Sequence, residues 1–211
     1  MAANRAPGAR EEPLNRDPSK RLLSKTRSFA FACLVASFLV FPLAASGEVF
    51  YGKNQGLERA FPDADRVERR TYVLTKREAE RLEEASESEL PSRLVTIYEG
   101  WQGDELLGYA HIDVDHVRAR KQALMISLTP EGRIGKIDIL AFHEDTRYMV
   151  PTKVIESLTG NSFGDQIRVG VDVDAVSGAT LTLRSTTAAA RRMLAYYAIL
   201  LKVTPAAFEK P

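Results

Sequence analysis

The sequence predicts an α+β domain in which helices flank an antiparallel sheet and a long helix lies near the C-terminus. Two observations lead to this fold class. Four strand-like segments occupy the middle of the chain, at residues 94–98, 106–114, 123–128 and 134–142. A long amphipathic segment follows them, starting near residue 183. Strands grouped together and helices outside the group are typical of α+β rather than of alternating α/β folds.

The strand predictions depend on residues that alternate between apolar and polar. Such alternation gives a strand one buried face, and it is found at Leu124, Ile126 and Leu128, and again at Ile137, Ile139 and Ala141. Thr129-Pro130-Glu131-Gly132 separates these two segments and has the composition of a tight turn. We therefore expect the four strands to form an antiparallel sheet.

Short helices and one further strand are predicted on either side of this group. Residues 54–61 suggest a short helix, and residues 66–74 read as a strand. Thr75 and Glu78 have the spacing of a capping box, which predicts a helix to about residue 86. Pro151 is accepted in the first turn of a helix, and we expect one at 153–158 that Gly160 ends.

The last helix is the clearest element. Its apolar stripe recurs at spacings of three and four residues, and Pro205 ends the pattern. The stripe consists of Leu183, Thr187, Ala190, Leu194, Tyr197 and Leu201. Arg191 and Arg192 lie off it, so we expect them on a solvated helix face rather than in an anion site.

The chain divides into three parts by charge and hydropathy. Residues 1–27 contain seven Lys/Arg and three Asp/Glu, whereas residues 28–46 contain no charged residue. A basic flank before an apolar run is typical of an export signal, and this run fits either a cleaved signal peptide or an uncleaved membrane anchor. We therefore expect 1–27 to be a cytoplasmic lead, 28–46 a signal peptide or membrane anchor, and 47–211 one domain on the extracytoplasmic side of the bacterial cytoplasmic membrane.

Composition restricts the partners and the chemistry. The single cysteine, Cys33, lies inside the apolar run, so residues 47–211 contain no thiol and form no disulfide. The net charge is +1, and nothing in this balance points to a nucleic-acid partner.

The segment Asp174-Ala175-Val176-Ser177-Gly178-Ala179-Thr180 stands directly before the last helix. By spacing alone it could be a turn followed by a helix cap. The pattern Asp-x-x-Ser-Gly-Ala-Thr also resembles the recognition sequence of flavin transferases, which move FMN from FAD onto the last hydroxyl. Its continuation, Leu181-Thr182, resembles the covalent-flavin subunits of the Rnf complex and of sodium-translocating NADH:quinone reductase.

A looser resemblance to FMN-binding-domain proteins covers most of residues 47–211. It includes the segment from Gly56 to Phe61, Gly108-Tyr109, Pro130-Glu131-Gly132, and His143-Glu144 with Tyr148. Many of these proteins read Arg-Glu-Pro-x-Gly-Tyr where this chain reads His143-Glu144-Asp145-Thr146-Arg147-Tyr148. The glutamate and the tyrosine persist, and the arginine and the proline do not.

The resemblance implies FMN attached by a phosphoester to Thr180. It implies a cofactor-binding set of Thr180, Asp174, Ser177, Gly178, Ala179, Thr182, Glu144 and Tyr148, and no catalytic or metal-binding residue. Gly178 and Ala179 are small enough for the segment to enter a transferase, Asp174 would help to present the hydroxyl, and Ser177 and Thr182 can donate to the phosphate. The N-terminus of the following helix favours an anion.

The expected function is electron transfer by an exported flavoprotein. A flavin transferase is then needed for maturation, and a membrane redox complex or cytochromes would exchange electrons with the flavin. Two alternatives remain: a periplasmic flavin-dependent reductase with its own substrate, and a non-flavin binding or assembly module.

One further cluster has the composition of a metal site. His111, Asp113 and Asp115 alternate along one strand, but exposed polar residues on the solvent side of a sheet explain the pattern more simply. We therefore expect no metal.

Overall fold

An antiparallel sheet of six strands is the centre of the computed structural model, which describes residues 48–202. The strand order is β1-β6-β5-β4-β3-β2, so that β2 to β6 form a meander and β1 pairs beside β6. The strands are β1 (Glu48–Val49), β2 (Arg66–Val73), β3 (Leu94–Gln102), β4 (Glu105–His116), β5 (Lys121–Leu128) and β6 (Ile134–Phe142). Every neighbouring pair is antiparallel, as the sequence predicted for the four central strands.

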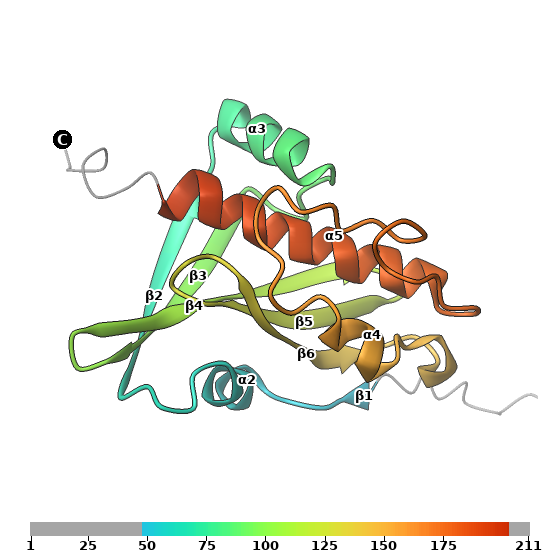
Figure 1. Cartoon of the computed structure of the whole chain (residues 1–211), viewed down its shortest axis with the longest axis horizontal. Helices are drawn as coiled ribbons and strands as arrows, with labels where there is room; N and C mark the ends of the chain where they lie inside the picture. The colour runs from blue at the N-terminus through green and yellow to red at the C-terminus, as the bar shows by residue number, and fades with distance from the viewer. Residues whose placement is uncertain (1–47, 203–211) are drawn as a thin grey trace, which may run out of the picture. The chain divides into compact units, whose positions relative to one another are not determined.

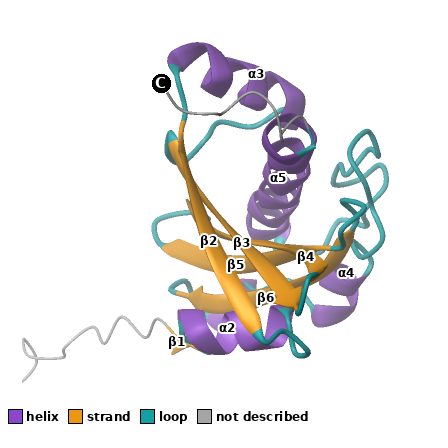
Figure 2. Cartoon of the chain, turned by 90° about the vertical axis from the view of Figure 1, so that its left-hand side faces the viewer, coloured by secondary structure: helices purple, strands orange, loops and turns teal. Residues whose placement is uncertain are grey.

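Four α-helices accompany the sheet in the described part of the chain. They are α2 (Lys53–Ala60), α3 (Lys76–Ser86), α4 (Thr152–Glu156) and α5 (Thr180–Tyr196). A 3₁₀ turn, η1 (Thr146–Tyr148), precedes α4, and a π-helical turn, η2 (Tyr197–Leu201), continues α5. Figures 1 and 2 show α3 and α5 on one side of the sheet and α2 on the other. The α+β fold class with a long C-terminal helix is therefore confirmed.

The capping box predicted at the start of α3 is present. The backbone N–H of Glu78 donates to Thr75 Oγ1 at 3.3 Å, and the backbone N–H of Thr75 donates to Glu78 Oε2 at 2.8 Å. Both residues thereby satisfy N–H groups that the helix itself leaves unpaired. The predicted turn between β5 and β6 also forms, with the Gly132 N–H donating to the Thr129 carbonyl at 2.9 Å.

The period of two along β5 places residues on opposite faces of the sheet. Leu124, Ile126 and Leu128 join the larger core beneath α5. Met125 joins a smaller core with Phe61 and Leu140 on the α2 side. Apolar burial on both faces, at about 25 cal/mol per Å² of apolar surface, holds the helices to the sheet.

The predicted stripe on α5 is buried at Leu183, Thr187, Ala190 and Leu194. Met193, Tyr196 and Arg192 are buried as well, although they lie outside that stripe. Because α3 covers α5 from the side away from the sheet (Figures 1 and 2), two faces of this helix are enclosed rather than one. Residues 1–27, 28–46 and Pro205, on which the other sequence predictions fall, lie outside the described residues.

Candidate functional site at the start of helix α5

The motif 174–180 connects a tight turn to α5. The Arg168 carbonyl accepts the backbone N–H groups of Val171, Asp172 and Val173 at 3.2, 3.0 and 3.2 Å. Val169 and Val173 form an isolated bridge within the same turn. The chain reaches the motif from a fixed turn and leaves it into a 17-residue helix, so both ends of the segment are held.

The middle of the motif is open to solvent. Asp174, Ser177 and Gly178 are exposed, and only Ala179 is buried. Gly178 has φ +84°, a left-handed conformation that glycine adopts readily, and a Cβ built there would meet no atom within 4 Å. Another protein could therefore reach this segment without displacing other described residues.

Thr180 is the first residue of α5. Its side chain is half-buried, and its Oγ1 donates to the Val176 carbonyl at 3.2 Å. The hydroxyl thus lies at the junction of the exposed motif and the helix. One weak hydrogen bond is all that it must give up to react.

The N-terminus of α5 carries no cap. Ala179 occupies the N-cap position without a side-chain hydrogen bond, and the first turn contains no acidic residue. The first backbone bond into the helix runs from Leu183 N–H to the Ala179 carbonyl, at 2.9 Å. The N–H groups of Thr180, Leu181 and Thr182 have no acceptor among residues 48–202. This end of the helix is suited to an anion, because three open donors and the positive end of the helix dipole point the same way.

Thr182 links the helix to the segment that holds Tyr148. Its Oγ1 donates to the Tyr148 carbonyl at 2.6 Å, and its side chain is 2% exposed. The structure therefore gives this hydroxyl a role in positioning η1 against α5, and its expected contact with a phosphate stays a prediction.

Tyr148 is half-buried, and two guanidinium groups lie near its ring. The Arg118 guanidinium is 5.0 Å from the centre of its ring, and that of Arg147 is 5.6 Å from it. Cations at this distance from an aromatic ring attract it electrostatically. Arg147 is adjacent to Tyr148 in the chain, whereas Arg118 comes from the β4–β5 turn and meets Tyr148 only in the fold, so sequence reasoning did not single out this pair of cations.

Glu144 closes the β4–β5 turn. Its Oε1 accepts the backbone N–H of Ala119 at 2.8 Å and of Arg120 at 2.9 Å. Burial by itself would raise the pKa of this carboxyl, but the two N–H groups outweigh burial and lower it. Glu144 thus fixes the loop that carries Arg118.

Gln122 was not predicted as a site residue. Its side chain is 1% exposed and lies against α5, where Nε2 donates to Ser185 Oγ at 2.9 Å. Its Oε1 has no partner in the described part of the chain. A buried polar atom without a partner costs free energy and is uncommon. A lone glutamine at the head of an apolar strand carries no sequence signal that would have revealed this.

The cluster of His111, Asp113 and Asp115 does not lie on a solvent face, and this expectation was wrong. His111 is 9% and Asp113 2% exposed, because α5 covers this face of β4. Arg192, expected on a solvated helix face, is also buried, and its guanidinium contacts Asp113 at 2.7 Å and Asp115 at 2.9 Å. No group of residues suited to a metal ion is found within residues 48–202.

None of the helices among the described residues is long and apolar enough to span a membrane. The apolar run at 28–46 is outside these residues.

Part of the chain is similar to a known protein family. No curated protein matches the chain. Residues 120–195 match the model of the FMN-binding domain family. The matched range begins just before β5 and ends within α5, and it contains Asp174, Ser177, Gly178, Ala179 and Thr180 as well as Glu144, Tyr148 and Thr182. This match includes the whole motif and supports an FMN-binding domain over residues 120–195.

Proposed function

We propose that the protein holds FMN covalently on Thr180 and transfers electrons on the outer side of the cytoplasmic membrane. The observation that carries the proposal is the uncapped N-terminus of α5, with the Thr180 hydroxyl beside three N–H donors that lack an acceptor among the described residues. In α3, by contrast, a side-chain cap is present: Thr75 Oγ1 accepts the N–H of Glu78, and Glu78 Oε2 accepts the N–H of Thr75. A helix of 17 residues gains from a cap, so an open N-terminus is explained if an anion belongs there.

Attachment would be a group transfer carried out by a flavin transferase. The Thr180 oxygen forms a bond to the phosphorus of the FMN half of FAD, and the pyrophosphate bond to the AMP half breaks. AMP leaves, and the hydroxyl proton passes to a base of the transferase or to Asp174. No oxidant or reductant is needed, because the oxidation state of phosphorus and of the flavin does not change.

The residues present fit the phosphate of such a cofactor. After attachment the Thr180 oxygen is part of a phosphoester that retains a negative charge, and the N–H groups of Leu181 and Thr182 can donate hydrogen bonds to the phosphate oxygens. Arg118 and Arg147 add positive charge near Tyr148, which Thr182 ties to α5. Bound FMN would supply reversible uptake and release of electrons, while the protein supplies placement and an anchor.

The same proposal includes a location and partners. Residues 28–46 would export or anchor the domain, with the basic residues of 1–27 left in the cytoplasm. Outside the cytoplasm free FMN is not supplied, so a covalent bond prevents its loss. A membrane redox complex or cytochromes would then deliver and collect the electrons.

The test compares two substitutions at one position. In cells that contain the transferase, wild-type protein should give a fluorescent band on a denaturing gel under blue illumination, because only covalent flavin survives denaturation. Thr180→Val keeps the shape of the side chain and should abolish the band. Thr180→Ser keeps the hydroxyl and should retain it.

A dark wild-type band in such cells would overturn the proposal, and so would a fluorescent Thr180→Val band. Fractionation of the same cells tests the location. The fluorescent protein should be recovered with the membrane or the periplasm, and its recovery in the cytoplasm would contradict export.

A further inference from the structure

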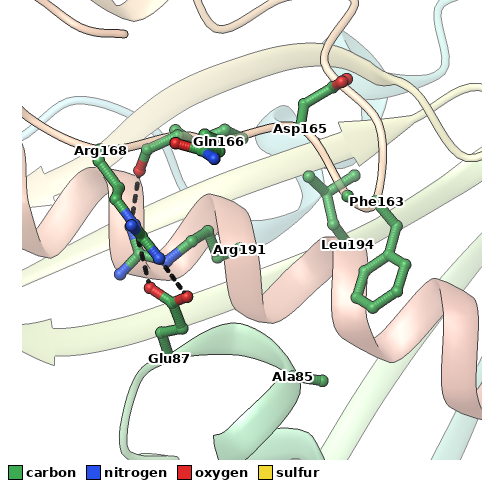
Figure 3. Close-up of a pocket in the computed structure, with 10 residues that line it drawn as sticks. Ala85, Glu87, Phe163, Asp165, Gln166, Arg168, Arg191 and Leu194 are labelled. Atoms are coloured by element: carbon green, nitrogen blue, oxygen red, sulfur yellow. Dashed lines mark hydrogen bonds and ion pairs between the residues drawn. The ribbon is translucent and has the colours of Figure 1, made fainter. Parts of the chain in front are cut away.

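A second site lies farther along α5, between this helix, the C-terminal end of α3 and the loop 163–168 (Figure 3). It is a cavity of about 280 Å³. Arg191, which lines it, is eleven residues beyond Thr180 on the same helix. At a rise of 1.5 Å per residue this is about 16 Å along the helix axis. No residue of the motif lines the cavity, so it is separate from the flavin site.

Arg191 supplies a positive charge that is incompletely balanced. Its Nε donates to the Ser86 carbonyl at 2.8 Å and one terminal nitrogen donates to the Ile167 carbonyl at 2.7 Å. Within residues 48–202 it forms no ion pair with a carboxylate. Burial lowers the pKa of Arg191, as do the nearby guanidinium groups of Arg192 and Arg168, although Glu87 acts the other way. A carboxylate placed beside it would therefore be favoured.

Arg168 is the second cation at this end of the cavity. It forms a two-pronged ion pair with Glu87, in which Nε lies 3.2 Å from Oε2 and the second contact joins a terminal nitrogen to Oε1. Both side chains are about half exposed, and exposed pairs of this kind contribute little stability. The ion pair can therefore break, or Arg168 can bind a second carboxylate as well, at a small cost in free energy.

The acidic residues near the cavity do not cancel these two cations. Among the described residues, only the carboxylate of Glu87 forms an ion pair with either of these two arginines. Asp165 also lines the cavity, but Figure 3 shows its carboxylate pointing away from Arg168 and Arg191. It accepts hydrogen bonds from the backbone N–H and the hydroxyl of Ser162, at 2.7 and 2.9 Å. The polar end of the cavity thus holds two guanidinium groups and one carboxylate, an excess of one positive charge.

The opposite end of the cavity is apolar. Phe163 and Leu194 lie together on this side, across from the arginines (Figure 3). Phe163 is 47% exposed and lines the cavity. A ligand that covered this ring would gain apolar burial at the same time as ion pairing.

We propose that the cavity binds a small aromatic monocarboxylate. Its carboxylate would pair with Arg191 and share Arg168 with Glu87, and its ring would lie against Phe163 and Leu194. One excess positive charge matches a monoanion better than a phosphate dianion. The volume is near the lower limit of small-molecule sites, which suits a single ring.

The experiment uses sodium benzoate as the probe and the full-length chain. Binding is measured by titration calorimetry and by the NMR signals of the Nε–H groups of Arg191 and Arg168, which report on the cavity directly. Benzoate should shift both signals. Benzamide, a neutral molecule of the same shape, and inorganic phosphate should bind more weakly than benzoate.

Two substitutions at exposed positions should change the affinity for benzoate in opposite directions. Glu87→Gln removes the competing carboxylate and should tighten benzoate binding roughly two- to five-fold, whereas Arg168→Gln should weaken it by a similar factor. Glu84→Gln and Arg81→Gln, at exposed positions of α3 outside the cavity, are the matched controls and should leave the affinity unchanged. Neither Glu87→Gln nor Arg168→Gln removes the hydrogen bonds of Arg191 to the Ser86 and Ile167 carbonyls, so we expect both variants to fold.

Three results would overturn the proposal. Unchanged Arg191 and Arg168 signals would show that the anion does not reach the cavity. Equal affinity for benzamide would show that charge is not recognised, and tighter binding of phosphate would assign the site to a different anion. None of these outcomes depends on flavin attachment at Thr180.

Discussion

At the scale of single residues, Thr75 and Thr180 lie at the N-termini of their helices, one position apart in the helix, and have opposite effects on the free N–H donors. Thr75 is the N-cap of α3, and its hydroxyl accepts the N–H of Glu78. Thr180 is the first residue inside α5, and its hydroxyl turns back to the Val176 carbonyl. One threonine consumes a free donor of its helix, and the other leaves the donors open. We attribute this difference to the anion that the start of α5 is suited to hold.

His111 should make stability depend on pH. Burial lowers the pKa of its imidazole, partly offset by the Thr96 carbonyl and Asp113. The unfolded chain therefore binds a proton near pH 6.5, where the folded chain does not. The free energy of unfolding should fall as the pH is lowered below about 6.5, with a slope of up to about 1.4 kcal/mol per pH unit, and level off below the folded pKa.

Urea unfolding between pH 7.5 and 5 measures this slope. His111→Gln should reduce it, whereas His143→Gln, at an exposed histidine, should keep the wild-type slope. If His111→Gln and wild type lost stability in parallel as the pH fell, His111 would not be the group responsible.

The residues that the sequence could identify are those whose role is local. The Thr75–Glu78 capping box needs only a spacing of three, and it formed as predicted. The burial of Asp113 could not be predicted in this way, because its partner Arg192 is 79 residues away. A polar residue alternating on a strand reads as a solvent face until the helix that covers it is known. The same holds for Arg118 and Tyr148, which meet only in the fold.

At the scale of elements, Gly108 allows β4 and β5 to pair closely. It has φ +150°, and a Cβ at this position would lie 2.2 Å from the Leu128 carbonyl oxygen on β5. In an ordinary strand, alanine is preferred to glycine by roughly 0.5–1 kcal/mol. Here the preference should reverse, and Gly108→Ala should lower the free energy of unfolding by about 2 kcal/mol or more.

The matched substitution is Gly135→Ala on β6. A Cβ at Gly135 meets Ser127 Oγ at 3.5 Å, an ordinary contact, and its φ is not in the left-handed region. This variant should be neutral or slightly stabilising in the same denaturant titration. Equal effects of the two substitutions would show that the approach of β5 does not constrain Gly108.

Periodicity predicted the elements well where they are long. The four central strands and α5 each show their repeat, and a tight turn marks the β5–β6 hairpin. The two-residue β1 is too short to have a period, and only its pairing with β6 defines it. Likewise the sequence showed one apolar stripe on α5, whereas the packing of α3 against the far side of the helix encloses a second face.

At the scale of the whole molecule, both cores share the same strands. The larger core under α5 and the smaller one under α2 are lined by alternate residues of β5, so both depend on the same strand. We therefore expect residues 48–202 to unfold in one cooperative step. Trp101 on β3, the only tryptophan of the chain, reports on the sheet, and far-UV circular dichroism reports mainly on the helices.

Leu183→Ala tests this coupling from one side. Leu183 is fully buried in the core under α5, and its truncation should cost about 2–5 kcal/mol. If unfolding is cooperative, the Trp101 fluorescence midpoint and the dichroism midpoint should fall together and by the same amount. Leu181→Ala, at a neighbouring position that is 46% exposed, should change stability by about 0.5 kcal/mol or less. A Trp101 transition that stayed in place while the helical signal moved would mean that α5 can detach from an intact sheet, and the proposed flavin attachment site at Thr180 would then be separable from the fold that supports it.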